Sequence, residues 1–243
     1  MKNQYFADRR DFMKYDLLME LAERTPGVSG ITNIPMLTPN DNTGEGNVLA
    51  YSEASGRSDL YHFLRSSLAK GDRNICNLRT LFQGREYAYY GHRDDVLYVH
   101  EQREEYFASV PSRCLQDSIV FVDPDTGIQT GDMNYMRKKG IDRYLFWDDI
   151  VQTVSRMSGA SILVVYQHLQ RNAKLVIQNV RDKALDLCRY ADVPSVATVD
   201  DRDVAYLITG RTPPLMSHLG LSLPAYAESR GLRYHLFMNE QPR

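Results

Sequence analysis

The sequence predicts an α/β protein, a three-layer sandwich built on a mainly parallel sheet with an antiparallel edge. The first reason is the order of the segments, because strand-like apolar stretches alternate along the chain with amphipathic helical stretches. The second reason is that the central strand-like segments, at residues 119–122 and 161–166, are apolar on both faces. Such strands are typical of parallel sheets that helices cover on both sides.

The first half of the chain begins with an amphipathic helix. In DFMKYDLLMELA (11–22), Phe12, Tyr15 and Met19 recur at helical spacing. ITNIPML (31–37) reads as a strand despite its proline, and a polar loop follows it. The other elements expected before residue 111 are a helix at 58–69, a strand at 96–100 and a helix at 103–110.

The second half continues the alternation after strand 119–122. The expected elements are helices at 147–157 and 172–190 and strands at 161–166, 195–199, 204–208 and 234–238. No shift in composition marks a domain boundary, so we expect a single α/β domain over residues 1–243. Turn-forming and polar residues predict loop insertions near 84–95, 126–142 and 211–230.

Composition and charge restrict the class of protein. The 243 residues carry a net charge of −2 and 25% charged residues, which is typical of a soluble globular protein. Three widely spaced cysteines form neither a CxxC pair nor an even disulfide set, which indicates a cytoplasmic location. No apolar run approaches the roughly 20 residues of a membrane span, so no membrane partner is expected. The net charge still allows a local basic face. Its candidate residues are Arg9, Arg10, Lys14, Arg137, Lys138, Lys139 and Arg143.

Polar residues follow three of the predicted strands. The stretch SIVFVDPDTG (118–127) shows this most clearly, because a buried strand runs directly into two carboxylates. Since the carboxyl ends of parallel strands share one edge of a sheet, we expect the three ends to line one cleft. The candidate residues are Asn40 and Asp41 after the first strand, Asp123 and Asp125 after the second, and Tyr166, Gln167 and His168 at the end of the third.

Asp123 and Asp125 are the candidate catalytic residues. A carboxylate at a strand end is held rigidly and partly desolvated, so its pKa is open to tuning. It can orient a water, hold a metal or accept a hydrogen bond from an amino group. The plainer alternative is that Asp123 caps a turn whose geometry Gly127 supplies.

The remaining candidates suit binding of a nucleobase and its phosphates. Tyr166, Gln167 and His168 combine stacking faces with hydrogen-bonding groups, and Asn40 and Asp41 would assist them. The alternative for the asparagine and aspartate is a simple turn. The candidate phosphate ligands are Lys14 and Arg171, which would otherwise be structural or solvated.

No metal or cofactor is expected from the motifs. The sequence has no HxxxH, no HExxH and no cluster of Cys and His. The alternative is a magnesium site of Asp123 and Asp125 with Asp200 and Asp201, in the DxDT order of haloacid-dehalogenase phosphatases. Gly44-x-Gly46 does not complete a GxGxxG fingerprint, so a nucleotide loop is not expected, and S-adenosylmethionine is retained as the alternative cofactor.

Several segments, taken in order, resemble an uncharacterised bacterial family with DPD(N/T)G and YQH motifs. These segments are YFADRRDFMKY (5–15), MLTPND (36–41), FVDPDTG (121–127), RYLFWDDI (143–150) and VYQHLQR (165–171). The layout distantly resembles the ribosomal-RNA adenine methyltransferases of the RlmJ type, which implies a Rossmann-like methyltransferase fold. Their DPPY motif is replaced here by Asp123-Pro124-Asp125-Thr126, so the aromatic that would stack the target base is missing. Uracil-DNA glycosylases are similar in placing an Asp-Pro pair at a strand end, where the aspartate serves water attack.

These observations give three hypotheses of function. The first is a nucleobase-directed hydrolase of the DNA glycosylase type that uses Asp123 without a cofactor, and the resemblance is compatible with a role in defence against phage. The second is a nucleic-acid adenine methyltransferase that holds S-adenosylmethionine in the loop at 40–47. The third is a degenerate fold kept as a nucleic-acid-binding module. DNA is the expected partner of the first.

Overall fold

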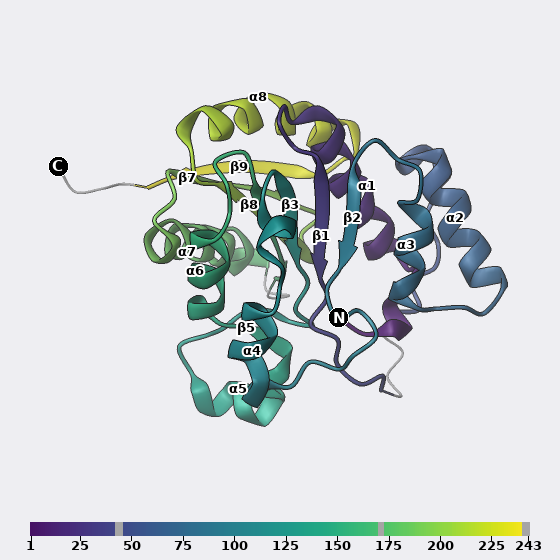
Figure 1. The fold of residues 1–243 in the computed structure, drawn as a ribbon, viewed down its shortest axis with the longest axis horizontal. Helices are drawn as coiled ribbons and strands as arrows, with labels where there is room; N and C mark the ends of the chain where they lie inside the picture. Colours follow the sequence, from purple (N-terminus) through teal and green to yellow (C-terminus); the bar gives the residue numbers. More distant parts are fainter. Residues whose placement is uncertain (42–45, 170–172, 240–243) are drawn as a thin grey trace.

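The structure, a computed structural model, describes residues 1–41, 46–169 and 173–239. Its centre is a seven-stranded sheet in the order β2-β1-β3-β6-β8-β7-β9, which runs through the middle of the molecule (Figure 1). The strands of this sheet are β1 (Gly30–Ile34), β2 (Ala88–Gly91), β3 (Ser118–Val122), β6 (Ile162–His168), β7 (Ser195–Asp200), β8 (Val204–Gly210) and β9 (Arg233–Met238). A separate small sheet pairs β4 (Gly127–Ile128) with β5 (Tyr144–Leu145).

The main sheet is parallel on one side and antiparallel on the other. β2, β1, β3 and β6 run in the same direction, and Ile119 of β3 lies between Ile31 of β1 and Ile162 of β6. β8 runs antiparallel to both β6 and β7, and β9 runs antiparallel to β7. The predicted α/β sandwich of Rossmann-like form, with a mainly parallel sheet and an antiparallel edge, is therefore confirmed.

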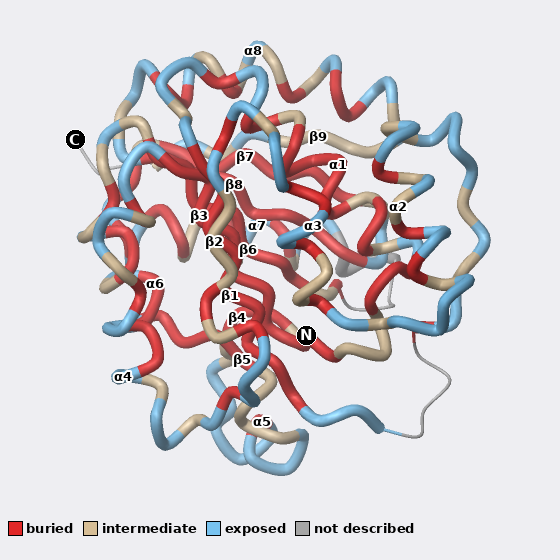
Figure 2. Tube along the Cα trace, turned by 45° about the vertical axis from the view of Figure 1, so that its right-hand side comes forward, coloured by how far each residue is buried: buried red, intermediate tan, exposed pale blue. Residues whose placement is uncertain are grey.

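Helices cover both faces of the sheet. The helices are α1 (Arg9–Arg24), α2 (Ser58–Ala69), α3 (Leu78–Leu81), α4 (Arg103–Ala108), α5 (Met133–Lys139), α6 (Trp147–Ser155), α7 (Ala173–Ala191) and α8 (Pro213–Ser229). α1, α2, α3 and α8 pack on one face, where they meet Ile119 and Phe121 of β3. α4, α6 and α7 pack on the other, where they meet Val120 and Val122. The sheet therefore forms the buried middle layer (Figure 2), and no helix in the described ranges combines the length and the apolar run that crossing a bilayer requires.

Helix α1 forms because its apolar residues share one face and its first turn is capped. Asp8 is the N-cap, and its carboxylate accepts a hydrogen bond from the backbone N–H of Asp11 at 2.9 Å. Phe12, Tyr15 and Met19 are all buried against the sheet, as their spacing predicts. The helix runs toward the amino ends of the parallel strands, so its first turn lies at their carboxyl ends.

Two of the predicted loop insertions are wrong in detail. The segment at 211–230 is largely the helix α8, in which Pro213 and Pro214 occupy the first turn, where the missing N–H groups are not needed. Leu219 and Leu223 bury its inner face against the sheet, and this packing outweighs the cost of Pro224 inside the helix. The segment at 126–142 contains β4 and α5.

The strand predicted at 96–100 is also wrong. The chain there forms no strand, and Val96, Leu97 and Val99 are 49%, 52% and 40% exposed. The strand next to β1 is instead β2, inside the loop predicted at 84–95, with Tyr89 opposite Ile31. β2 is short and only half-buried because it lies at the edge of the sheet, which gives it a weak apolar signal.

Gly127 is expected to be essential to the turn that joins β3 to β4. Its φ is +133°, and a Cβ there would lie 2.5 Å from the amide of Gln167, whose Oε1 accepts a hydrogen bond from the Ile128 N–H at 2.8 Å. We expect Gly127→Ala to lower the free energy of unfolding in urea by about 1–3 kcal/mol because the backbone is strained and the amide is displaced. Gly131→Ala is the control, since no heavy atom lies within 4 Å of its added Cβ. Equal losses in the two variants would contradict this account.

Candidate active site

The carboxyl ends of β3 and β6 meet the amino-terminal residues and the first turn of α1 around one small pocket. The chain passes from β1 to β2 on one side and returns to β3 on the other, so the crevice between β1 and β3 is the switch point of the sheet. Ligands of open α/β sheets bind at this place. The pocket is lined by side chains from four segments, among them Asp8, Arg10, Lys14, Asp123, Tyr166 and His168.

A buried charge cluster forms the floor of the pocket. The Lys14 ammonium donates to Asp11 Oδ1 at 2.8 Å and to Asp123 Oδ2 at 2.7 Å. All three side chains are at most 3% exposed. Burial lowers the pKa of Lys14, but the two carboxylates outweigh burial and hold the pKa above its ordinary value. Lys14 therefore stays charged and enclosed by carboxylates, rather than presented to solvent as the predicted phosphate ligand.

Asp8 is another carboxyl group in the pocket, and its pKa differs from that of an ordinary aspartate. It is 4% exposed, and burial, with the nearby charge of Asp11, raises its pKa to about 7. A large share of Asp8 therefore carries a proton at neutral pH. Asp8 is not among the candidates that the sequence predicts. The signal that indicates it is the spacing of Asp8, Asp11 and Lys14, which places three ionisable groups on one side of a helix that packs on the core.

Tyr166 and His168 form the β6 wall of the pocket. Their side chains lie on the same face of the strand, and the Tyr166 hydroxyl is 3.3 Å from His168 Nε2. Burial lowers the pKa of His168 to about 4, so its imidazole is neutral at physiological pH. Gln167 points to the opposite face, where its amide bonds the Ile128 N–H and the carbonyl of His168. The structure thus brings Tyr166 and His168 to the pocket and uses Gln167 to hold β4.

Asp125 lies beside Asp123 but is held by cations. Its carboxylate forms ion pairs with Arg143 and, at 3.7 Å, with Lys2. Burial raises the pKa of Asp125, but the Met1 ammonium, Arg143 and Lys2 outweigh burial and lower the pKa overall. Asp125 is therefore ionised at neutral pH and fixes the turn after β3.

Of the remaining predicted residues, none lines the pocket within the described chain. The Oδ1 atom of Asn40 accepts a hydrogen bond from the backbone N–H of Gln4 at 3.1 Å, and Asp41 pairs with Lys2. Both are exposed and tie their loop to the amino-terminal segment. Arg171 lies outside the described residues, as does part of the loop proposed for S-adenosylmethionine.

The amino-terminal residues fill the crevice at the switch point. The Met1 amine donates to the carbonyl oxygens of Met36, after β1, and of Asp123, after β3, both at 3.2 Å. The Thr38 N–H donates to the Met1 carbonyl at 2.8 Å. The N-terminus is accordingly drawn at the carboxyl ends of the strands (Figure 1). The free volume left in the pocket is about 20 Å³, which is room for one water molecule.

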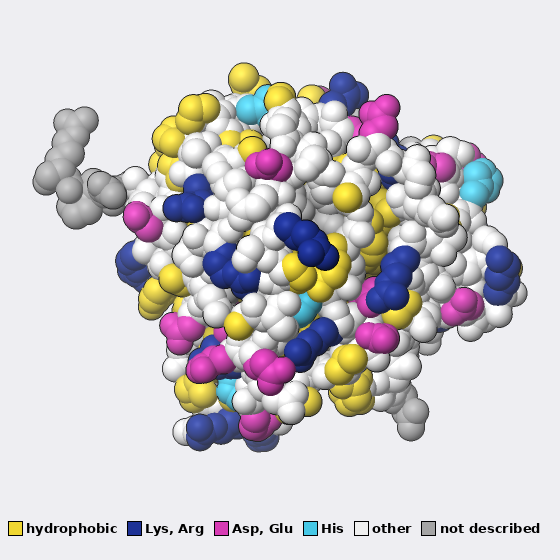
Figure 3. Space-filling view, viewed as in Figure 1, with side chains coloured by type: hydrophobic (Ala, Val, Ile, Leu, Met, Phe, Trp, Pro, Cys, Tyr) yellow, Lys and Arg dark blue, Asp and Glu magenta, His cyan; other side chains and the backbone are white. Residues whose placement is uncertain are grey.

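The predicted basic face is divided in the structure. Lys14 is buried and Arg143 pairs with Asp125, so neither contributes an open cation. Figure 3 shows acidic and basic side chains interspersed over the face drawn there. In the part of the chain that the structure describes, no group of His, Cys, Asp and Glu is arranged to hold a metal ion.

The pocket combines a proton donor, a carboxylate paired with a lysine and a neutral imidazole around space for a water. Asp8 can donate a proton near neutral pH, and Asp123, which Lys14 holds in place, can orient water or stabilise a positive charge. Tyr166 and His168 add an aromatic wall.

No protein-family model matches the chain, and no curated protein matches it.

Proposed function

We propose that the protein is a hydrolase that cleaves the N-glycosidic bond of a nucleobase. The observation that carries the proposal is the pairing of two carboxyl groups in one pocket. Asp8 has a pKa raised to about 7, and Asp123 is ion-paired with Lys14 at 2.7 Å. Many enzymes that hydrolyse glycosidic bonds use such a pair, one group to protonate the leaving group and one to stabilise the oxocarbenium-like sugar or direct water.

The parts of the pocket have distinct roles in this reaction. Asp8 donates its proton to the departing base, and Asp123 orients the single water for which the pocket has room. Tyr166 and His168 contact the base through a ring and a neutral imidazole. Arg10, a half-buried residue of the lining, replaces Lys14 as the group that meets a phosphate.

Access requires a movement of the pocket walls. A nucleobase is far larger than the free volume of about 20 Å³, so the base enters when groups at the mouth, including Arg10, turn aside. Rearrangements of side chains on binding are common in proteins. The proposed substrate is a base in DNA or in a nucleotide, and a cytoplasmic location and a role in phage defence belong to the same proposal.

The test measures release of free base by chromatography from nucleosides, nucleotides and DNA oligonucleotides, with abasic-site formation scored on the DNA. We expect turnover that Asp123→Asn lowers by about 10²–10⁴-fold, the range for loss of one positioned acid or base. Asp148→Asn is the matched control, because that carboxylate is 87% exposed. Unchanged activity in Asp123→Asn would remove the central role assigned here. Binding of DNA without turnover would favour the nucleic-acid-binding module.

A methyltransferase is the second candidate, and one observation favours it. The switch point between β1 and β3 adjoins Asp123, which could accept a hydrogen bond from a target amine. Met1 and Lys2 occupy that crevice, so S-adenosylmethionine would have to displace them. A ligand present at 100 times its dissociation constant adds about 2.7 kcal/mol to stability. An unchanged melting temperature with S-adenosylmethionine would exclude this candidate.

A further inference from the structure

A second, larger pocket lies next to the first one around helix α1. Its volume is about 350 Å³, which falls within the roughly 300–1,000 Å³ of small-molecule sites. Arg9, Phe12 and Asp16 of α1 line it at helical spacing, one position along from Asp8 and Asp11 in the first pocket. The two pockets therefore use adjacent faces of the same helix.

Flat aromatic rings form part of the wall of this second pocket. Phe12 stacks on Tyr51 with ring centroids 4.9 Å apart and planes at 17°. The Tyr51 hydroxyl donates to the carbonyl of Ala7 at 3.1 Å, which fixes the ring. Tyr226 adds a third ring, and its hydroxyl donates to Asp16 Oδ2 at 3.0 Å. Rings held in this way favour a planar ligand that can stack on them.

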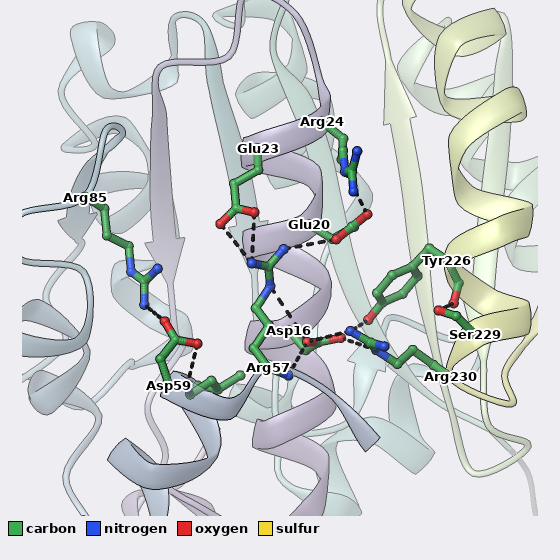
Figure 4. A network of polar contacts seen from close by, with 11 residues as sticks. Asp16, Glu20, Glu23, Arg24, Arg57, Asp59, Arg85, Tyr226, Ser229 and Arg230 are labelled. Carbon is green, nitrogen blue, oxygen red and sulfur yellow. Dashed lines mark hydrogen bonds and ion pairs between the residues drawn. The ribbon is translucent and has the colours of Figure 1, made fainter. Parts of the chain in front are cut away.

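Two guanidinium groups, those of Arg9 and Arg230, line the pocket. Arg230 donates from Nε to Asp16 Oδ2 at 2.8 Å and from Nη2 to Asp16 Oδ1 at 3.3 Å (Figure 4). Within the described residues its Nη1 meets no acceptor, so part of the guanidinium remains for a ligand. Arg9 is 58% exposed and lies 3.9 Å from Asp201. The Asp16 side chain is 1% exposed, which makes it a rigid anchor for Arg230.

We propose that this second pocket binds a planar anion of the nucleoside monophosphate class. The base stacks on Tyr51, the partly exposed ring of this wall, which Phe12 supports from behind, and the phosphate meets Arg9 and Arg230. This site is separate from the proposed hydrolytic pocket, and its existence does not depend on that activity.

Isothermal titration with AMP, adenosine and inorganic phosphate tests the proposal. We expect AMP to bind at least tenfold more tightly than either of its halves, because the aromatic wall and the two cations act on different parts of it. The titrations use the wild type and Asp123→Asn, which the proposed function makes inactive, so the affinity is measured with and without turnover. If millimolar AMP binds neither the wild type nor Asp123→Asn, the proposal is overturned, and the hydrolytic test is unaffected.

Four variants locate the binding. Arg9→Gln is expected to weaken AMP about tenfold through loss of a charged hydrogen bond. Ser55→Trp, at an exposed position in the lining, is expected to abolish binding by filling the pocket. Arg24→Gln is the matched control on the same helix, 71% exposed and outside the lining, and should bind as the wild type does. Unchanged affinity in Ser55→Trp, or a loss in Arg10→Gln without a loss in Arg9→Gln, would place AMP elsewhere and contradict the proposal.

Discussion

Replacement of Lys14 by methionine is expected to lower the free energy of unfolding by about 3–5 kcal/mol, the cost of breaking a buried ion pair by removing one partner. The side chain keeps its length, but Asp11 and Asp123 then remain buried without the ammonium that both contact. Such a loss is a large part of the roughly 5–15 kcal/mol that stabilises a typical protein. Urea unfolding at neutral pH, followed by circular dichroism, measures it.

Two further variants separate charge from packing. Lys70→Met removes an exposed lysine at the end of α2 and is expected to change stability by no more than about 0.5 kcal/mol. Combining Lys14→Met with Asp11→Asn and Asp123→Asn neutralises the whole cluster. We expect this triple variant to recover much of the stability, because exchanging a complete buried ionic network for neutral groups is often tolerated. A loss in Lys14→Met no greater than that in Lys70→Met would contradict the buried-cluster account.

Replacement of Asp8 by asparagine is expected to lower the turnover number of the proposed reaction by about 10²–10⁴-fold, as loss of a positioned general acid does. The pKa of Asp8 is about 7, so wild-type activity should fall as the pH rises through 7 and the proton is lost. Asparagine can still accept the N-cap hydrogen bond of Asp11, so α1 should remain folded. Rates measured from pH 5 to 9 with the best substrate test both statements. A variant that keeps the wild-type rate and its decline above pH 7 would remove Asp8 from the reaction.

Asp8→Asn is also expected to change how the free energy of unfolding depends on pH, in a direction that the pKa of Asp8 determines. The pKa of Asp8 is about 7 in the folded protein and about 3.8 for an unperturbed aspartate, so the folded state binds the proton more tightly. The contribution of Asp8 to stability is therefore greatest at low pH and is lost as the pH rises from about 4 to about 7. Relative to wild type, Asp8→Asn should be more stable at pH 8 than at pH 5 in urea unfolding. Asp132→Asn, at the exposed N-cap of α5, is the control and should show no such difference.

The central part of the fold could be predicted because its signal is local. β3 and β6 are apolar on both faces, and that pattern requires helices on both sides. A strand at the edge of the sheet lacks this apolar pattern, so the sequence predicts a loop where β2 lies. The sequence does not indicate α8 for another reason, since prolines predict a break in a helix that tertiary packing stabilises here.

The site was predictable in position but not in its charges. Parallel strands bring Asp123 and His168 to one edge, as their places at strand ends predict. Side chains alternate between the two faces of a strand, so Gln167 points away from Tyr166 and His168. The prediction that all three line one cleft did not apply this alternation. The partner of Lys14 lies 109 residues away, and the raised pKa of Asp8 depends on burial. Both arise from tertiary contacts that no local pattern encodes.

Helix α1 supplies walls to both pockets, so the two pockets share one structural element. Asp8, Asp11 and Lys14 face one, and Arg9 and Phe12 face the other, on a single rigid rod. A ligand that shifts α1 when it binds in one pocket must alter the affinity of the other pocket for its own ligand. Thermodynamic linkage makes that effect reciprocal, so each occupant changes the dissociation constant of the other by the same factor.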